Sequence, residues 1–245
     1  MPVFAAPPPP LGRAASLFLD LDGTLVHLID RPDEVRTDAE LNDILVRVAR
    51  ALEGRLAIVS GRSLAQLDLI LGPVAETLAL SGSHGCEFRI NGKVHCPDRD
   101  DNLNEATERF RQFAEMSPLV LLEEKSFGVA LHYRMLAEVE PEARKLAKQL
   151  AEELGLYVQI GKMMVELRPY GYSKGDAIRR LIAETAMAGP APVFVGDDIT
   201  DEDGFEAAVA LGGHGILVGA PRTSAALYTL PDIAAVRNWL RELIT

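Results

Sequence analysis

The sequence has few cysteines and a shortage of positive charge. Its two cysteines, Cys86 and Cys96, flank an Asn91-Gly92 pair that predicts a two-residue hairpin turn. Pairing outward from this turn sets Cys96 opposite Glu87 rather than Cys86, so no disulfide is implied and a reducing, cytoplasmic setting is expected. The formal net charge of -11 argues against nucleic acid or an anionic membrane surface as the main partner, because both attract basic patches.

Long apolar runs and clusters of histidine or cysteine are also missing from the sequence. No apolar segment is long enough to span a bilayer, and the first ten residues lack the basic and apolar regions of a secretory signal. Their four consecutive prolines predict a flexible tail over residues 1–14. A zinc site is not expected, since zinc favours histidine and cysteine ligands. Hydrophobic residues still make up 48% of the 245 residues, enough for one large domain or two small ones.

The most informative stretch is an apolar run, residues 17–19, that leads into Asp20, Asp22 and Gly23. Such a run is typical of a strand buried on both faces of a parallel sheet. Further strands are expected at 56–59, 77–80, 193–195 and 216–218, the last of them. Helices with one apolar face are expected at 39–52, 64–71, 174–182 and 232–243. This alternation predicts a doubly wound, Rossmann-like parallel α/β core over residues 15–99 and 169–245.

Between these two stretches the pattern changes to helix, hairpin, helix, hairpin. Helices near 103–116 and 141–154 each precede a pair of strands, at 119–123 with 127–134 and at 157–160 with 164–168. We therefore expect an inserted α+β cap domain over residues 100–168. Its sheet has one apolar face for the helices and one polar face, which carries His132, Arg134, Glu166 and Arg168. An ordinary solvated face remains the alternative for each of these side chains.

Acidic and hydroxyl side chains follow three of the expected core strands. The first strand leads to Asp20 and Asp22, the second to Ser60, and the strand at 193–195 to Asp197, Asp198 and Asp201. Ligands of open α/β sheets gather at the carboxyl ends of the strands, so these side chains should meet there. A helix start at Lys174 adds a positive charge. A cluster of carboxylates alone suits Mg²⁺.

These residue types fit a phosphoryl transfer. Asp20 would attack phosphorus and form an acyl phosphate, and Asp22 would protonate the leaving oxygen and then activate water. Mg²⁺ and Lys174 would neutralise the phosphate oxygens, to which Ser60 and backbone N–H groups would donate hydrogen bonds. As a lone pattern, Asp-x-Asp-Gly-Thr could instead be an acidic turn that begins a helix.

The motifs together resemble a known superfamily. Residues 20–24, Ser60, Lys174-Gly175 and the acids at 197, 198 and 201 resemble, in this order, the four motifs of haloacid dehalogenase superfamily phosphatases. Within that group the chain is similar to the trehalose-6-phosphate phosphatases, in the stretches 60–62, 82–87, 123–125, 131–134, 166–169 and 171–175. The resemblance implies a haloacid dehalogenase-like core with an inserted cap, Mg²⁺ as cofactor and a small sugar phosphate as the substrate. A monomer is slightly favoured.

The resemblance also implies roles for individual residues. The catalytic residues would be Asp20, Asp22, Thr24, Ser60 and Lys174. The metal would be held by the Asp20 and Asp197 side chains and the Asp22 carbonyl, with Asp198 or Asp201 reached through water. The residues that bind the sugar phosphate would be Gly61, Arg62, His84, Glu123, Lys125, His132, Arg134 and Glu166. Glu124 is an alternative to Glu123, because either acid could reach the substrate beside Lys125.

Two other hypotheses compete with this reading of the motifs. A sibling capped phosphatase for sucrose phosphate or mannosyl-phosphoglycerate, or a phosphohexomutase, would share the core and differ in the cap. A non-catalytic phospho-receiver module needs a single acceptor and has no use for an acid/base two residues further on. Asp22 therefore argues against the receiver.

Overall fold

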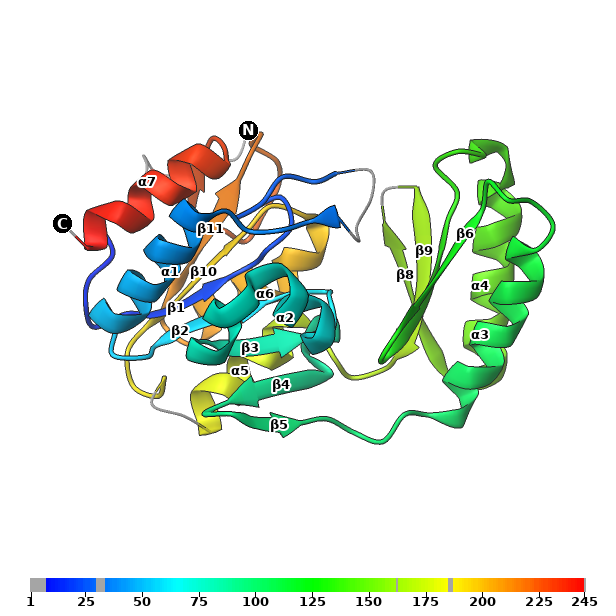
Figure 1. The fold of residues 1–245 in the computed structure, drawn as a ribbon, viewed down its shortest axis with the longest axis horizontal. Helices are drawn as coiled ribbons and strands as arrows, with labels where there is room; N and C mark the ends of the chain where they lie inside the picture. Colours follow the sequence, from blue (N-terminus) through cyan, green and yellow to red (C-terminus); the bar gives the residue numbers. More distant parts are fainter. Residues whose placement is uncertain (1–7, 30–33, 162, 185–186, 245) are drawn as a thin grey trace. The chain divides into compact units, whose positions relative to one another are not determined.

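The computed structural model describes residues 8–29, 34–161, 163–184 and 187–244 (Figure 1). The chain divides into two compact units. The core unit comprises Met1–Cys96 and Ser173–Thr245, and the cap unit comprises Pro97–Tyr172. The boundaries expected from the sequence, after residue 99 and before residue 169, lie a few residues from these.

The core unit is built on an eight-stranded sheet in the order β12-β11-β10-β1-β2-β3-β4-β5. Six neighbouring strands run parallel: β1 (Ser16–Leu19), β2 (Leu56–Val59), β3 (Ala79–Gly82), β10 (Pro192–Gly196), β11 (His214–Val218) and β12 (Tyr228–Leu230). An antiparallel hairpin of β4 (Glu87–Ile90) and β5 (Lys93–His95) extends one edge. The strands β1, β2 and β10 are buried along their whole length, as their apolar runs predicted.

Helices cover both faces of this sheet. On one face, α1 (Ala39–Ala51), α2 (Leu64–Leu71) and α7 (Ile233–Leu243) pack on Leu17 and Leu19 of β1. On the other face, α5 (Lys174–Glu184) and α6 (Glu202–Ala210) pack around Phe18. Successive side chains of a strand point to opposite faces, so one short apolar run serves two cores. The prediction of a doubly wound α/β core is confirmed.

Two strand predictions in the core unit need correction, and in the cap unit the strand expected at 119–123 begins two residues later, as β6 (Leu121–Lys125). The strand expected at 77–80 is β3, shifted to Ala79–Gly82, because Gly72–Thr77 form a 3₁₀ helix that has Pro73 at its start. The strand at 216–218 is also not the last one, since β12 follows it and pairs with β11. The strand β12 has only three residues of mixed polarity, Tyr228–Leu230, so it contains no apolar run that would predict a strand.

The N-terminal tail differs in part from the expectation of a flexible segment over residues 1–14. Residues 1–7 lie outside the described part of the chain. Leu11, by contrast, is only 7% exposed and belongs to the apolar cluster of α1 and α7. The Trp239 indole N–H also donates to the Pro9 carbonyl oxygen at 3.0 Å. Residues 9–11 are therefore held against α7.

The hairpin of β4 and β5 follows the register that the Asn91-Gly92 pair predicted. Ile90 pairs with Lys93, and both turn residues have a positive φ, 50° for Asn91 and 75° for Gly92. This register carries Cys96 away from Cys86, and both cysteines are free thiols.

The cap unit consists of a four-stranded antiparallel sheet in the order β6-β7-β9-β8 and two helices. Its strands are β6 (Leu121–Lys125), β7 (Gly128–His132), β8 (Leu156–Gly161) and β9 (Met164–Pro169), and its helices are α3 (Asp101–Ala114) and α4 (Glu140–Leu154). Alternate residues of β7 and β9, such as Val129 and Leu167, pack with the helices. Because β7 ends at His132, Arg134 lies in the turn beyond it and not on the strand as expected. No helix among the described residues is long and apolar enough to cross a membrane.

Candidate active site

The carboxyl ends of β1 and β10 bring acids from distant parts of the chain together. Asp20 follows β1, and its backbone N–H donates to the Val195 carbonyl oxygen of β10 at 2.9 Å. Asp197 directly follows β10, and Asp201 lies one short turn later. Each of these three acids offers a carboxylate oxygen, and the three oxygens lie within 4.8 Å of one another. A single cation could therefore contact all three.

Lys174 provides the positive charge of this cluster. It is the first residue of α5 and is 4% exposed. Its Nζ donates to Asp20 Oδ1 at 2.7 Å and to Asp201 Oδ1 at 2.6 Å. The structure thus brings together four of the residues singled out from the sequence, namely Asp20, Lys174, Asp197 and Asp201.

Three carboxylates around one ammonium leave an excess of negative charge. Burial raises the pKa of Asp20 well above its usual value; Lys174 offsets this in part, whereas Asp201 and Asp197 add to it. Burial and the Asp201 charge raise the pKa of Asp197 to about 6. Burial alone would lower the pKa of Lys174, but Asp20 and Asp201 outweigh it and raise that pKa. The cluster must therefore keep a proton or bind a cation, and its oxygen ligands fit Mg²⁺.

Asp198 and Asp201, the two candidates for the acid that reaches the metal through water, lie in different surroundings. Asp201 is fully buried, and its Oδ2 accepts the backbone N–H groups of Asp197 and Asp198, both at 2.9 Å. Asp198 is exposed, and its Oδ1 accepts the Ile199 N–H at 2.7 Å, which caps the 3₁₀ helix Ile199–Asp201. Asp201 therefore belongs to the buried cluster, whereas Asp198 faces solvent.

Asp22 is held by an arginine from the loop after β2. The Arg62 guanidinium donates from Nε and Nη2 to the two Asp22 carboxylate oxygens, each at 2.7 Å. This two-armed geometry is the strong form of an arginine–carboxylate pair. The Asp22 side chain is 23% exposed, which leaves it open to a substrate.

The turn after β1 depends on a glycine. Gly23 has a φ of +86°, and a Cβ at this position would lie 2.1 Å from Asp197 Oδ2. The next residue, Thr24, is fully buried, and its hydroxyl donates to Asp197 Oδ1 at 3.4 Å. Gly23 and Thr24 therefore set the space that the Asp197 carboxylate occupies.

The loop after β2 packs against the loop after β3. Ser60 Oγ accepts the Arg62 N–H at 3.1 Å, and the Ser60 carbonyl oxygen accepts the His84 N–H at 3.1 Å. His84 has an unusual φ of 56°, and a Cβ on Gly61 would lie 2.6 Å from two atoms of the His84 ring. A glycine is thus required where the imidazole covers the loop. The structure places Ser60, Gly61, Arg62 and His84 in one group.

The remaining predicted substrate residues lie in the cap unit, and all but Arg134, which lies in the turn after β7, are on the sheet face opposite its helices. Lys125 Nζ donates to Glu166 Oε2 at 2.6 Å, and the Glu166 side chain is 3% exposed. His132 Nε2 lies 2.8 Å from Glu123 Oε2. Glu124 points the other way and pairs with Arg111 of α3. The polar face therefore presents Glu123, whereas Glu124 forms an exposed ion pair with α3 on the other face.

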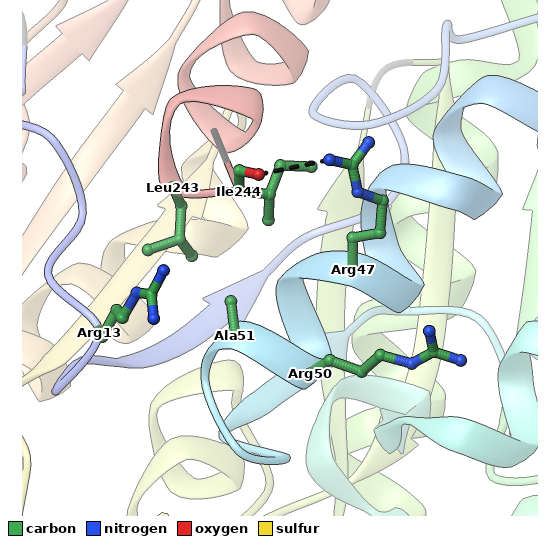
Figure 2. Close-up of a pocket in the computed structure, with 6 residues that line it drawn as sticks. All are labelled: Arg13, Arg47, Arg50, Ala51, Leu243 and Ile244. Carbon is green, nitrogen blue, oxygen red and sulfur yellow. Dashed lines mark hydrogen bonds between the residues drawn. The ribbon is translucent and has the colours of Figure 1, made fainter.

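A hollow elsewhere on the core unit is separate from this group. Figure 2 shows the cavity, of about 230 Å³, which is lined by Arg13, Arg47, Arg50, Ala51, Leu243 and Ile244. It lies where α1 and α7 end and shortly before β1 begins, which is the edge of the sheet opposite to the acids. Arg47 donates to the Ile244 carbonyl oxygen at 3.3 Å, as basic side chains near helix C-termini commonly do.

The residues that hold the acidic turn from the outside are not recognisable from the sequence. Glu202, the first residue of α6, accepts hydrogen bonds from Ser224 and Ala225 and pairs with Arg222. These partners lie about twenty residues downstream in a loop with no helical or strand pattern. No local sequence signal connects them to the acids.

Comparisons with known proteins agree with this geometry. The fold is that of haloacid dehalogenase-like proteins: a haloacid dehalogenase-like hydrolase from Bacteroides thetaiotaomicron matches with a TM-score of 0.67 at 18% identity, over 92% of this chain and 97% of its own. A solved trehalose-6-phosphate phosphatase related protein matches with a TM-score of 0.78 at 30% identity, over 92% of this chain and 95% of its own. The trehalose-6-phosphate phosphatase of Escherichia coli K12 is 37% identical over 97% of this chain and 89% of its own length.

The model of the family described as trehalose-phosphatase matches residues 18–232. The chain therefore belongs to the trehalose-phosphatase family, and the resemblance inferred from its motifs is confirmed.

Proposed function

We propose that this protein hydrolyses trehalose 6-phosphate to trehalose and inorganic phosphate. Membership of the trehalose-phosphatase family supports this substrate. The observation that carries the chemistry is the buried Lys174, whose ammonium bonds both Asp20 and Asp201 beside Asp197. Such a site can neutralise a phosphate group and present a carboxylate to it.

Asp20 is the nucleophile of this proposal. Lys174 fixes the carboxylate through Oδ1, so that the other oxygen attacks phosphorus while the bond from phosphorus to the sugar oxygen breaks. Asp22 gives its proton to that leaving oxygen and then takes a proton from the water that cleaves the acyl phosphate. Arg62, which holds Asp22 in the structure, carries a second positive charge that can turn to the substrate phosphate.

The donor set fits Mg²⁺ as cofactor, with Asp20, Asp197 and the Asp22 carbonyl as ligands and Asp201 as an indirect one. When bound, the ion would supply the charge that offsets the phosphate oxygens. Thr24 keeps Asp197 in place, and Asp201 orders the backbone of the acidic turn. Both cysteines are free thiols, which agrees with a reducing compartment such as the cytoplasm.

The cap unit supplies the recognition of the sugar in this proposal. A disaccharide offers hydroxyl groups, which charged side chains bind well. Glu123, Lys125, His132 and Glu166 share one sheet face and can accept from or donate to such hydroxyls. The pairs that they form with one another orient these side chains before the sugar arrives.

The test is phosphate release from a panel of sugar phosphates by the purified protein with Mg²⁺. We expect trehalose 6-phosphate to give a kcat/KM far above those of sucrose phosphate, mannosyl-phosphoglycerate and hexose phosphates. Asp20→Asn, checked for its fold by circular dichroism, should release no phosphate from any of them. A preference for another ester, or isomerisation of a hexose phosphate without phosphate release, would overturn the proposed substrate.

A further inference from the structure

Arg222, in the loop after β11, forms hydrogen bonds with the acidic turn that follows β10, residues 197–202. Arg222 Nη2 donates to the Asp198 carbonyl oxygen at 2.6 Å, and its Nη1 donates to the Glu202 carboxylate and to the Thr223 carbonyl oxygen. The other Glu202 oxygen accepts the Ser224 hydroxyl at 3.1 Å and the Ala225 N–H at 2.8 Å. The side chains of Arg222 and Glu202 are both about three-quarters buried, with 27% and 24% exposed.

These contacts are made at Asp198 and Glu202, on either side of Asp201, which belongs to the buried carboxylate cluster. The Asp198 carbonyl oxygen also accepts the Asp201 N–H at 3.1 Å, and Glu202 directly follows Asp201 in the chain. Asp197 directly precedes Asp198. Arg222 forms hydrogen bonds with the Asp198 carbonyl and the Glu202 side chain, so it holds the backbone between Asp197 and Asp201 and the side chain that follows Asp201.

We propose that Arg222 is a positioning residue that fixes the 197–202 turn in the geometry needed to bind the metal. It acts through the Asp198 carbonyl and Glu202, and the inference rests on the proposed metal site. The planar guanidinium holds two acceptors at once in a fixed fork, which the single ammonium of a lysine does not do. Partners that orient metal ligands in this way commonly change metal affinity about 10- to 100-fold when they are replaced.

If Arg222 acts only through its charge, its removal should raise the affinity for Mg²⁺; if it acts by positioning the turn, its removal should lower that affinity. Removal of a positive charge near an acidic cluster, taken by itself, favours a bound cation and would tighten Mg²⁺ binding. Loss of the fork instead lets the turn relax away from the geometry of the cluster and weakens binding. The direction of the change therefore separates the two effects.

The experiment is calorimetric titration of Mg²⁺ into the metal-free, substrate-free protein. We expect Arg222→Gln to bind Mg²⁺ about tenfold more weakly than wild type, and Arg222→Lys to recover only part of the loss. The matched control is Arg50→Gln, which removes the same charge at the opposite edge of the sheet and should leave the affinity unchanged. With a small phosphate ester and saturating Mg²⁺, kcat of Arg222→Gln should return close to that of wild type.

Unchanged or tighter Mg²⁺ binding by folded Arg222→Gln overturns the inference and leaves the proposed function intact. A wild-type protein that binds no Mg²⁺ overturns the proposed metal site and the inference with it. If Arg222→Gln does not fold, Arg222→Lys decides instead, since it keeps the positive charge but cannot hold the Asp198 carbonyl and Glu202 in the same fork. Severalfold weaker Mg²⁺ binding by that variant supports the inference, and unchanged binding overturns it.

Discussion

Asp197 is the residue at which the loss of folding stability caused by burying a carboxylate charge in the site can be measured. Burial and the neighbouring Asp201 raise its pKa to about 6 from an ordinary 3.8. A carboxyl whose pKa is higher in the folded state binds its proton more tightly there. The folded protein therefore loses stability as this proton leaves with rising pH, provided that no cation takes its place.

We expect metal-free Asp197→Asn to be more stable than metal-free wild type above pH of about 6. The advantage should grow between pH of about 4 and about 6, and then stay level, because asparagine keeps the size of the side chain and never ionises. The measurement is the urea midpoint of both proteins across this range in EDTA. A difference that does not vary with pH would contradict the assigned electrostatic origin.

Sequence reasoning found the residues of the cluster that follow buried strands, but not the contacts that hold them. Asp20 and Asp197 could be placed because parallel strands align their carboxyl ends. Lys174 could be placed because a positive charge is needed among acids. Arg222 and Glu202 lie on separate elements whose approach depends on the packing of α6, so nothing in their local sequence shows that they meet.

Among the elements, the turn after β1 makes the strictest demand on the sequence. Gly23 combines a φ of +86° with a position where a Cβ would lie 2.1 Å from the Asp197 carboxylate. Gly54, between α1 and β2, has a φ of +85°, but a Cβ there would meet no atom within 4 Å among the described residues other than its chain neighbours. A comparison of substitutions at Gly23 and Gly54 therefore separates the effect of the left-handed backbone, which both share, from the effect of crowding against Asp197, which only Gly23 has.

We expect Gly54→Ala to cost about 1 kcal/mol of stability, from the left-handed backbone alone, and to keep full activity. Gly23→Ala should carry the same strain and in addition displace Asp197, which lowers Mg²⁺ affinity about tenfold or more. Thermal unfolding and Mg²⁺ titration of both variants provide the measurement. Equal Mg²⁺ affinities for the two variants would show that the close approach of Gly23 to Asp197 does not affect metal binding.

Elements with a strong periodic signal were predictable, and those shaped by their neighbours were not. The apolar runs of β1 and β2 and the one-sided spacing of α1 and α7 define these elements locally. The strand β12 exists because β11 offers it an edge, and β7 is shorter than its alternating pattern because the chain turns after His132. Pairing partners of this kind lie outside any local window of sequence.

For the molecule as a whole, the two units carry separate parts of the proposed function. The core unit holds the acids and Lys174, and the cap unit holds the charged face with Glu123, Lys125 and Glu166. The insertion of one unit into the other was predictable, because the alternation of strands and helices stops and later resumes. The pairing of Lys125 with Glu166 was not, since it depends on the register of β7 between β6 and β9.

We expect Glu166→Gln to lower kcat/KM for trehalose 6-phosphate about tenfold or more, through the loss of a charged hydrogen-bond acceptor for sugar hydroxyls. Hydrolysis of para-nitrophenyl phosphate, which has no sugar, should stay close to that of wild type. Glu124→Gln is the matched control, because that acid faces α3 and pairs with Arg111. Equal losses on both substrates, or an equal effect of the control, would remove Glu166 from sugar recognition.

The most direct measurement of the central claim is to trap the phosphoryl group on the protein. The protein is mixed with trehalose 6-phosphate and Mg²⁺, quenched in acid within a single turnover, digested and analysed by mass spectrometry. The account predicts one added phosphoryl group on the peptide that contains Asp20, sensitive to hydroxylamine as an acyl phosphate is, and absent from Asp20→Asn. A phosphoryl group on a different residue, or normal turnover by Asp20→Asn, would contradict it.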